Sequence, residues 1–251
     1  MFEKLGIQLY TIRDFMKTEE DIRNSFRKLK EIGYDQAQTA GCAIPYETFG
    51  QIAREEGIEI VGTHDNFNMM KHDLATSIEN HKKLGTTNMG IGGICMHSEE
   101  EIRGFIETFN DVAEKISKEG FKLTYHNHSH EFIKYNGVTA FQRFLDGFDK
   151  EKISFVLDTY WVQNAGADVC ALMKKMKGRI DILHLKDMEA KMNNTGAITE
   201  CGNGNLNFED IIPLAEEIGV KYFVVEQDIC PGDPFESARI SSEYLHKNFM
   251  K

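Results

Sequence analysis

The chain has 251 residues, 41% of them hydrophobic and only four of them proline, which is ample for one large core. Its formal net charge of −11 argues against charge-driven binding to nucleic acid or to an anionic membrane, and no run of Lys and Arg marks a local basic groove. The five scattered cysteines form no CxxC pair, and no stretch is apolar enough for a leader or a membrane span, so we expect a reduced, soluble, cytoplasmic protein.

Short apolar runs recur about every thirty residues, and an amphipathic helical pattern separates each run from the next. The runs that predict strands are Leu5–Tyr10, Tyr34–Thr39, Glu59–His64, Asn88–Gly92, Lys122–His126, Ile153–Asp158, Asp181–Leu185 and Tyr222–Glu226. The patterns that predict helices are Glu19–Ile32, Tyr46–Glu56, His72–Leu84, Glu99–Lys118, Val138–Phe148, Asp168–Lys177, Phe208–Ile218 and Phe235–Phe249.

Strands that alternate with helices predict right-handed βαβ units and a parallel sheet. Eight such units fit a closed (β/α)8 barrel. The rival is an open doubly wound sheet, which more often carries a Gly-rich nucleotide fingerprint after its first strand. Here the first strand ends in QLYTIRD, without that fingerprint. We therefore predict an α/β protein, a (β/α)8 TIM barrel forming a single domain over residues 1–251.

The stretch Gly120–Phe132, GFKLTYHNHSHEF, is the most informative part of the chain. It begins with the period-2 alternation of a strand and ends in His126, His128 and His130, followed by Glu131. Imidazoles and a carboxylate at a strand end suit metal ligation and proton transfer better than core packing. The alternative for any one of these histidines is a side chain in a polar loop that is solvated or bonded to the backbone.

In a TIM barrel the reactive residues lie at the carboxyl ends of the strands. Apolar runs here lead directly into polar residues, and four consecutive strands deliver His126, Asp158, His184 and Glu226 to one mouth. A mixed set of imidazoles and carboxylates suits Mn²⁺, Zn²⁺, Co²⁺ or Fe²⁺ better than Ca²⁺. Each residue also has a structural interpretation: Asp158 as a helix cap, His184 as a buried core histidine, and Glu226 as the partner of a Lys or Arg.

The segments at these positions together resemble a known family, over nearly the whole chain. They are GIQLYTIRD, GYDQAQTAG, THDN, YHNHSHEF, FVLDTYW, DILHLKD, CGNGNLNF and FVVEQD. The chain is similar to the xylose-isomerase-like TIM barrels, the sugar phosphate isomerase/epimerase group that also includes inosose dehydratases, hydroxypyruvate isomerases, ketose 3-epimerases and AP endonucleases of the same fold.

The resemblance implies one divalent metal ion, Mn²⁺ or Zn²⁺ first and Co²⁺, Fe²⁺ or Mg²⁺ as alternatives, held by His126, Asp158, His184 and Glu226. The chain departs from the family at several positions where Glu is frequent. His126 stands in one of them, and Gln38 and Asn203 stand in two others. The ketose 3-epimerases use two glutamates across the substrate, so His126 puts that two-base reaction in doubt.

Proton abstraction beside a carbonyl, through a metal-stabilised enediolate, remains the predicted mechanism. We expect Glu226 to be the base, and Glu131, His128 or His64 to supply the second acid/base function. Lys186 either steadies oxyanion charge or pairs with Asp187 as scaffold. The residues expected to contact substrate are Gln8, Tyr10, Gln38, Trp161 and Asn203, with Trp161 and Tyr160 forming an apolar wall unless they serve only in packing.

The predicted function is a sugar or cyclitol isomerase/epimerase with a small-molecule substrate. The first alternative is a keto-sugar lyase, either an inosose dehydratase-like enzyme or one that eliminates the aglycone of a 3-keto-glycoside. A non-catalytic sugar-binding protein and an AP-endonuclease-like role are further alternatives, and the acidic charge argues against the latter. The amides of Gly202–Asn205 offer a phosphate cradle, but no cations cluster there, which favours a neutral substrate. A homo-oligomer is possible.

Overall fold

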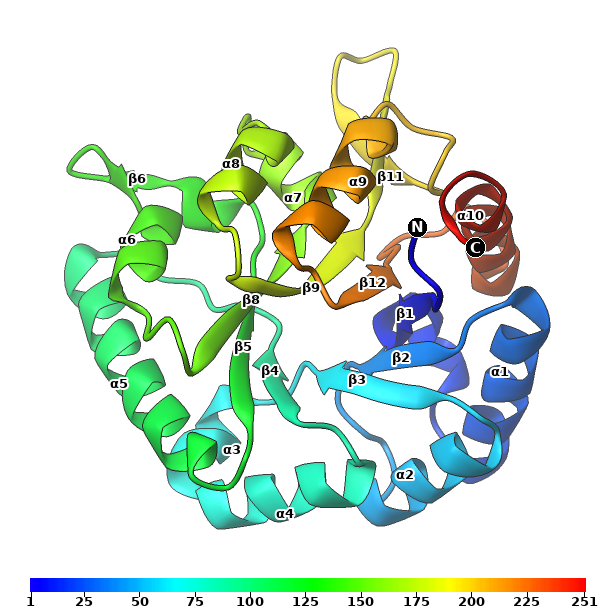
Figure 1. The fold of residues 1–251 in the computed structure, drawn as a ribbon, viewed down its shortest axis with the longest axis horizontal. Helices are drawn as coiled ribbons and strands as arrows, with labels where there is room; N and C mark the ends of the chain where they lie inside the picture. Colours follow the sequence, from blue (N-terminus) through cyan, green and yellow to red (C-terminus); the bar gives the residue numbers. More distant parts are fainter.

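A computed structural model describes residues 1–251 and shows the predicted barrel (Figure 1). Eight parallel strands follow one another in the order β3-β2-β1-β12-β9-β8-β5-β4. They are β1 (Gly6–Gln8), β2 (Gln36–Thr39), β3 (Glu59–Thr63), β4 (Asn88–Ile91), β5 (Lys122–His126), β8 (Ile153–Asp158), β9 (Ile180–Leu185) and β12 (Tyr222–Val225). All carboxyl ends therefore open onto the same face, as the sequence predicts.

The barrel closes between β3 and β4 through individual hydrogen bonds, because these two strands end the ladder order. The Asp65 amide donates to the Gly90 carbonyl at 2.8 Å, and the Gly90 amide donates to Thr63 Oγ1 at 3.0 Å. Asn88 Nδ2 donates to the Val61 carbonyl at 2.8 Å. A side chain at position 90 would collide with the Thr63 carbonyl, so only glycine permits this approach.

Helices surround the barrel, and most begin with a side-chain cap. They are α1 (Glu19–Ile32), α2 (Tyr46–Glu55), α3 (Phe67–His72), α4 (Leu74–Leu84), α5 (Glu99–Ser117), α6 (Ala140–Gly147), α7 (Thr159–Asn164), α8 (Val169–Lys175), α9 (Phe208–Ile218) and α10 (Pro234–Phe249). Thr18 and Asp21 form a capping box at the start of α1. Gly33 then ends α1 in the left-handed conformation.

The apolar core has two parts. A cluster of 58 buried residues fills the layer between the strands and the helices, whereas Val61, Val156, Ile182 and Val224 form a small separate cluster. These four come from β3, β8, β9 and β12, and each alternates along its strand with residues of the larger cluster. The small cluster therefore fills the inside of the barrel, below the mouth to which the polar residues point.

Several predicted boundaries were wrong. The first strand ends at Gln8, and Leu9–Phe15 forms a 3-10 helix, because the Tyr10 amide turns back to bond the Gln8 side chain. The predicted helix Val138–Phe148 begins with a strand: β6 (Lys134–Tyr135) and β7 (Val138–Thr139) form a hairpin whose turn places Asn136 and Gly137 at positive φ. No helix is both long and apolar enough to cross a membrane.

Several short elements were not predicted at all. The helix α7 follows β8 directly and α3 begins soon after β3, and both are too short to show a helical period. The strands β10 (Asp187–Ala190) and β11 (Gly196–Thr199) pair antiparallel and project from the barrel beyond β9 (Figure 1).

Candidate metal centre and active site

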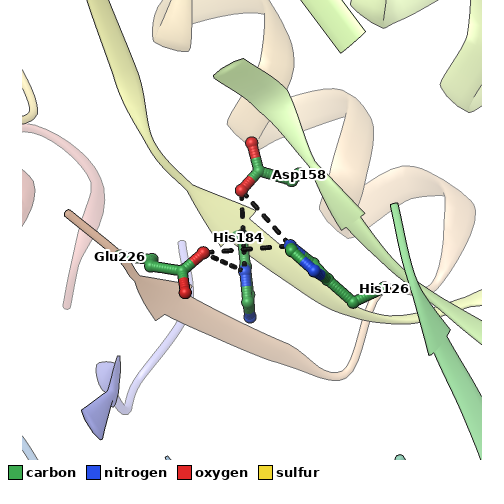
Figure 2. Close-up of side chains that lie close together, drawn as sticks. All are labelled: His126, Asp158, His184 and Glu226. Atoms are coloured by element: carbon green, nitrogen blue, oxygen red, sulfur yellow. Dashed lines mark hydrogen bonds and ion pairs between the residues drawn. The ribbon is translucent and has the colours of Figure 1, made fainter. Parts of the chain in front are cut away.

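Four side chains from consecutive barrel strands meet at the barrel mouth. Figure 2 shows His126, Asp158, His184 and Glu226 pointing toward one another. Their candidate ligand atoms all lie within 4.8 Å of one another, and all four residues are buried. His126 Nε2 is 3.4 Å from Asp158 Oδ2 and 3.8 Å from Glu226 Oε2, while His184 Nδ1 is 2.9 Å from the same Glu226 oxygen.

The two oxygens of Asp158 have different tasks. Oδ1 accepts a hydrogen bond from the Trp161 amide at 2.9 Å and caps α7, so the structural interpretation of this residue is correct. Oδ2 faces the two histidines, at 3.4 Å from His126 Nε2 and 3.7 Å from His184 Nδ1. The cap fixes the carboxylate plane, and the other oxygen is thereby aimed at the cluster.

The other two structural interpretations are also partly correct. His184 is fully buried and its Nε2 lies 2.6 Å from Gln38 Oε1, which orients the ring and leaves Nδ1 toward the carboxylates. Glu226 does pair with a lysine, since Lys186 Nζ is 3.2 Å from Glu226 Oε2. Neither contact removes the residue from the cluster.

Lys186 is a buried cation among three carboxylates. Its Nζ lies 2.8 Å from Asp228 Oδ2 and 3.4 Å from Asp158 Oδ2, in addition to its contact with Glu226. The alternative interpretation, in which Lys186 pairs with Asp187, is wrong, because the Lys186 ammonium bonds to Glu226 and Asp228 instead. Three carboxylates against one ammonium leave a formal charge of −2 before the histidines are counted.

The pKa values follow from this crowding. Burial lowers the pKa of His184, but Glu226 and Asp158 outweigh it and raise that pKa to about 9. Burial likewise raises the pKa of Glu226, yet Lys186 and His184 bring it well below its usual range. A buried imidazole is therefore held as a cation beside ionised carboxylates. The extra proton on this ring supplies positive charge that a bound metal ion would supply in its place.

These residues fit a divalent cation. The donor set is two imidazoles and two carboxylates, which suits Mn²⁺, Zn²⁺, Co²⁺ or Fe²⁺. Two further positive charges would balance the −2 left by Lys186 and the three carboxylates. The hydrogen bond at His184 Nε2 supplies the outer support that ligating histidines usually have. The cluster can hold a divalent metal ion.

A cavity of about 520 Å³ lies over this cluster. Five of the residues singled out from the sequence line it, namely Tyr10, His64, His126, His128 and Glu226. Asp228, which follows Glu226 at the same strand end, lines it too, as do Arg13 and Ile229, which the sequence did not mark. The cavity has room for a monosaccharide or cyclitol, and its floor is the candidate metal centre.

Glu131 lies behind the cavity wall. Its Oε1 accepts a hydrogen bond from Tyr125 Oη at 2.7 Å, and its Oε2 accepts one from the His128 amide at 2.8 Å. It therefore holds the backbone that carries His128. Burial and the nearby His126 lower the pKa of His128 to about 4, so this ring is neutral at physiological pH.

The remaining predicted residues lie at different depths. Gln8 and Gln38 are fully buried beneath the cavity, where they hydrogen-bond to each other and to the histidines. Trp161 packs against Lys186, whose Nζ is 4.9 Å from the indole centre, and against His128. Asn203 is exposed and bonds to Glu200 at 3.3 Å, and the structure does not bring it to the cavity.

The phosphate-cradle interpretation of Gly202–Asn205 is wrong. Asp187 Oδ2 accepts hydrogen bonds from the Gly202 and Gly204 amides, both at 3.0 Å, and its Oδ1 accepts one from the Leu206 amide at 3.1 Å. The chain's own carboxylate thus fills the site that an external anion would need.

Asp228 and Arg13 line the same cavity. The sequence places Asp228 with Glu226 at the end of the eighth predicted strand but gives it no role, and it does not mark Arg13 at all. Arg13 stacks on the Tyr10 ring at 4.2 Å and donates to the Asp228 carbonyl at 3.1 Å. No sequence signal reports that contact, because it joins residues 215 positions apart.

The fold and sequence match known proteins. The family model described as xylose isomerase-like TIM barrel matches residues 26–247. An inosose dehydratase from Geobacillus thermodenitrificans is 23% identical over 210 residues, which cover 77% of this chain and 66% of that enzyme. The chain thus spans just under two thirds of the length of that curated relative.

Two solved structures illustrate the likeness of fold. A sugar phosphate isomerase/epimerase from Parabacteroides distasonis superposes with a TM-score of 0.84 at 24% identity, covering 98% of this chain and 94% of the other. The IolI protein, whose structure contains a bound zinc atom, superposes with a TM-score of 0.75 at 14% identity, covering 97% of each chain.

Proposed function

Because the chain belongs to the xylose isomerase-like TIM barrel family, we propose that it is a metal-dependent enzyme that removes a proton beside the carbonyl of a keto-sugar or keto-cyclitol. The observation that carries this proposal is the buried cluster of His126, Asp158, His184 and Glu226 at the floor of the cavity. A divalent cation held there would act as a Lewis acid on the substrate's carbonyl oxygen and stabilise enediolate charge.

Glu226 is the base in this proposal. All hydrogen bonds of its carboxylate are made by Oε2, toward His184 and Lys186, so Oε1 is free to take a proton from a substrate in the cavity. The pKa of Glu226 lies well below its usual range, because Lys186 and His184 outweigh burial, and the base is therefore ionised at physiological pH. Lys186 holds the carboxylate in place through its contacts with Glu226 and Asp228.

Elimination is the reaction that the site supports best. Glu226 takes the proton from the carbon beside the carbonyl, the bond to a hydroxyl one carbon further breaks, and the departing oxygen takes that proton back from Glu226. The products are an unsaturated ketone and water, and Glu226 is ionised again. The inosose dehydratase likeness supports the same choice.

Isomerisation is the second candidate. One carboxylate can return the proton to the neighbouring carbon of the substrate, and the free Oε1 of Glu226 suffices for that. Epimerisation needs a second base on the opposite face of the substrate. The chain has His126, itself a candidate ligand, where a second glutamate would serve.

The test is an assay of Mn²⁺-loaded protein in D₂O, with free ketoses, 2-keto-inositol and 3-keto-glucosides as substrates and NMR of the products. Loss of water or an aglycone identifies a lyase, and deuterium in a rearranged sugar identifies an isomerase. Glu226→Gln should abolish turnover, whereas Glu217→Gln, an exposed position on α9, should leave it unchanged. Full activity of Glu226→Gln would contradict the assignment of the base.

A further inference from the structure

The side chain of Gln8 has an orientation that its surroundings fix. Gln8 is fully buried at the end of β1, and the Tyr10 amide lies 3.1 Å from Gln8 Oε1. A backbone N–H can only donate, so the atom it meets must be the amide oxygen and not the nitrogen. The Gln8 Nε2 group therefore points the other way, as a donor of two hydrogen bonds.

The two acceptors of those hydrogen bonds are Gln38 Oε1, at 3.1 Å, and His64 Nδ1, at 3.2 Å. His64 Nδ1 must carry a lone pair to accept, so the proton of the neutral ring is on Nε2. Since Gln38 presents its oxygen to Gln8, the same oxygen faces His184 Nε2 at 2.6 Å, and that nitrogen must carry a proton. His184 Nδ1, which faces Glu226 and Asp158, is then the atom that can bind a metal.

His64 completes the arrangement on the cavity side. It lines the cavity, and its Nε2 is buried with no partner in the protein. An unpartnered buried N–H is costly, and a substrate oxygen in the cavity would satisfy it. The ring stands 4.7 Å from His126 and 5.5 Å from His184, centre to centre, next to the candidate ligands.

We propose that Gln8 is a positioning residue that sets the tautomers of two histidines at once. Through Gln38 it holds His184 with the proton on Nε2 and Nδ1 free for the metal, and directly it holds His64 with Nε2–H directed at a hydroxyl or carbonyl oxygen of the substrate. His64 is accordingly a hydrogen-bond donor in this site and not the proton-abstracting base. The part concerning His184 rests on the proposed metal site, whereas the part concerning His64 does not.

Two substitutions that add the same charge separate this role from plain packing. Gln8→Glu removes the donor, because the new carboxylate offers only acceptors, so His64 Nδ1 must take the proton. The Gln38 side chain then turns its NH₂ toward the new carboxylate, and its oxygen no longer accepts a hydrogen bond from His184 Nε2. Gln38→Glu keeps an acceptor for both Gln8 Nε2 and His184 Nε2, and so preserves both tautomers. Gln8→Met, which has similar length and no charge, removes the donor without adding an acceptor.

The measurements are two-bond ¹H–¹⁵N spectra of ¹⁵N-histidine-labelled protein, which report the protonated ring nitrogen, and Zn²⁺ affinity. His64→Gln identifies the His64 signals. We expect the Nε2–H form of His64 in the wild type and Gln38→Glu, the Nδ1–H form in Gln8→Glu, and a mixture of both in Gln8→Met. Zn²⁺ affinity should fall about 10- to 100-fold in Gln8→Glu and should not fall in Gln38→Glu.

A pure Nε2–H signal of His64 in Gln8→Glu or Gln8→Met would overturn the proposal, as would equal losses of Zn²⁺ affinity in the two glutamate variants. If Gln8→Glu does not fold, Gln8→Met decides the question through the His64 signal alone. The His64 spectrum is recorded without metal as well, so a wild type that binds no Zn²⁺ would contradict the proposed function while leaving the His64 assignment testable.

Discussion

The ammonium group of Lys186 lies 3.2 Å from Oε2 of Glu226, the same oxygen that stands 2.9 Å from His184 Nδ1. One carboxylate oxygen thus serves a lysine and a candidate metal ligand together. Lys186 is 1% exposed, and this contact is shielded from solvent. The lysine is therefore part of the charge balance of the site, and its removal should lower the free energy of unfolding of the protein.

We predict that Lys186→Met destabilises the metal-free protein by about 3–5 kcal/mol, because three buried carboxylates lose their cation. Urea unfolding measures the change. Lys221→Met is the matched control: its ammonium, 57% exposed, pairs with Asp181, and its loss should cost less than about 1 kcal/mol. Added Mn²⁺ should recover part of the Lys186→Met loss. Equal stability of the two variants would contradict this account.

The seam between β3 and β4 gives a second prediction. Gly90→Ala would place a methyl group against the Thr63 carbonyl and Thr124 Oγ1, so we expect a loss of about 2 kcal/mol or more in the free energy of unfolding. Gly104→Ala, in the middle of α5 with open space around it, should instead stabilise by about 0.5–1 kcal/mol. Thermal unfolding of both variants measures the difference, and a stable Gly90→Ala protein would show that the seam tolerates opening.

His81 gives a prediction of pH dependence. It is fully buried, with Nε2 at 2.8 Å from Thr63 Oγ1, and burial lowers its pKa although Asp65 partly opposes this. The unfolded chain takes up this proton near pH 6.5 while the folded protein does not, so the contribution is present above pH 6.5 and is lost as pH falls.

The measurement is urea unfolding at pH 7.5 and at pH 5.5. Between these values the wild type should lose at most about 1.4 kcal/mol more stability than His81→Gln, which has no group to titrate at that position. His81→Gln will be less stable at both values because it loses hydrogen bonds, and only the pH slope is diagnostic. Parallel slopes would mean that the ring is protonated in the folded state.

Asp187 gives a prediction about the loop that it holds. Asp187→Asn replaces one of the acceptor oxygens for the Gly202, Gly204 and Leu206 amides with an NH₂ group, so we expect a loss of about 1–3 kcal/mol. Metal affinity should stay as in the wild type, since this carboxylate bonds to the loop amides and is not one of the four candidate ligands. Inorganic phosphate should not protect either protein against unfolding. Protection of the wild type by phosphate would reopen the cradle interpretation.

Much of the candidate site was predictable because strand ends in a parallel barrel converge on one mouth. The positions of His126, Asp158, His184 and Glu226 needed only the apolar runs before them. The contacts of Asp187 and Glu131 were not predictable, because both carboxylates bond to backbone amides of loops that have no repeating pattern. The orientation of the Gln8 side-chain amide was likewise not predictable, because it follows from the position of the Tyr10 amide in the structure.

The helices and strands also divide into predictable and unpredictable ones. The long helices and buried strands came close to their predicted bounds, since period 3.6 and period 2 persist over many residues in them. The single-turn helix α7 is set by the cap from Asp158, and the β10–β11 hairpin by pairing between short segments. Both depend on contacts that a short pattern does not encode.

Metal stoichiometry tests the central claim most directly. Wild-type protein dialysed against Mn²⁺ or Zn²⁺ should retain one equivalent, and Asp158→Asn should retain little, because Asn still caps α7 but offers no charged ligand. Asp168→Asn is the control: it makes the same change at the cap of α8, where Oδ1 accepts from the Ala171 amide at 2.7 Å, and it should retain one equivalent. Equal metal content in the two variants, or no metal in the wild type, would contradict a metal centre at the barrel mouth.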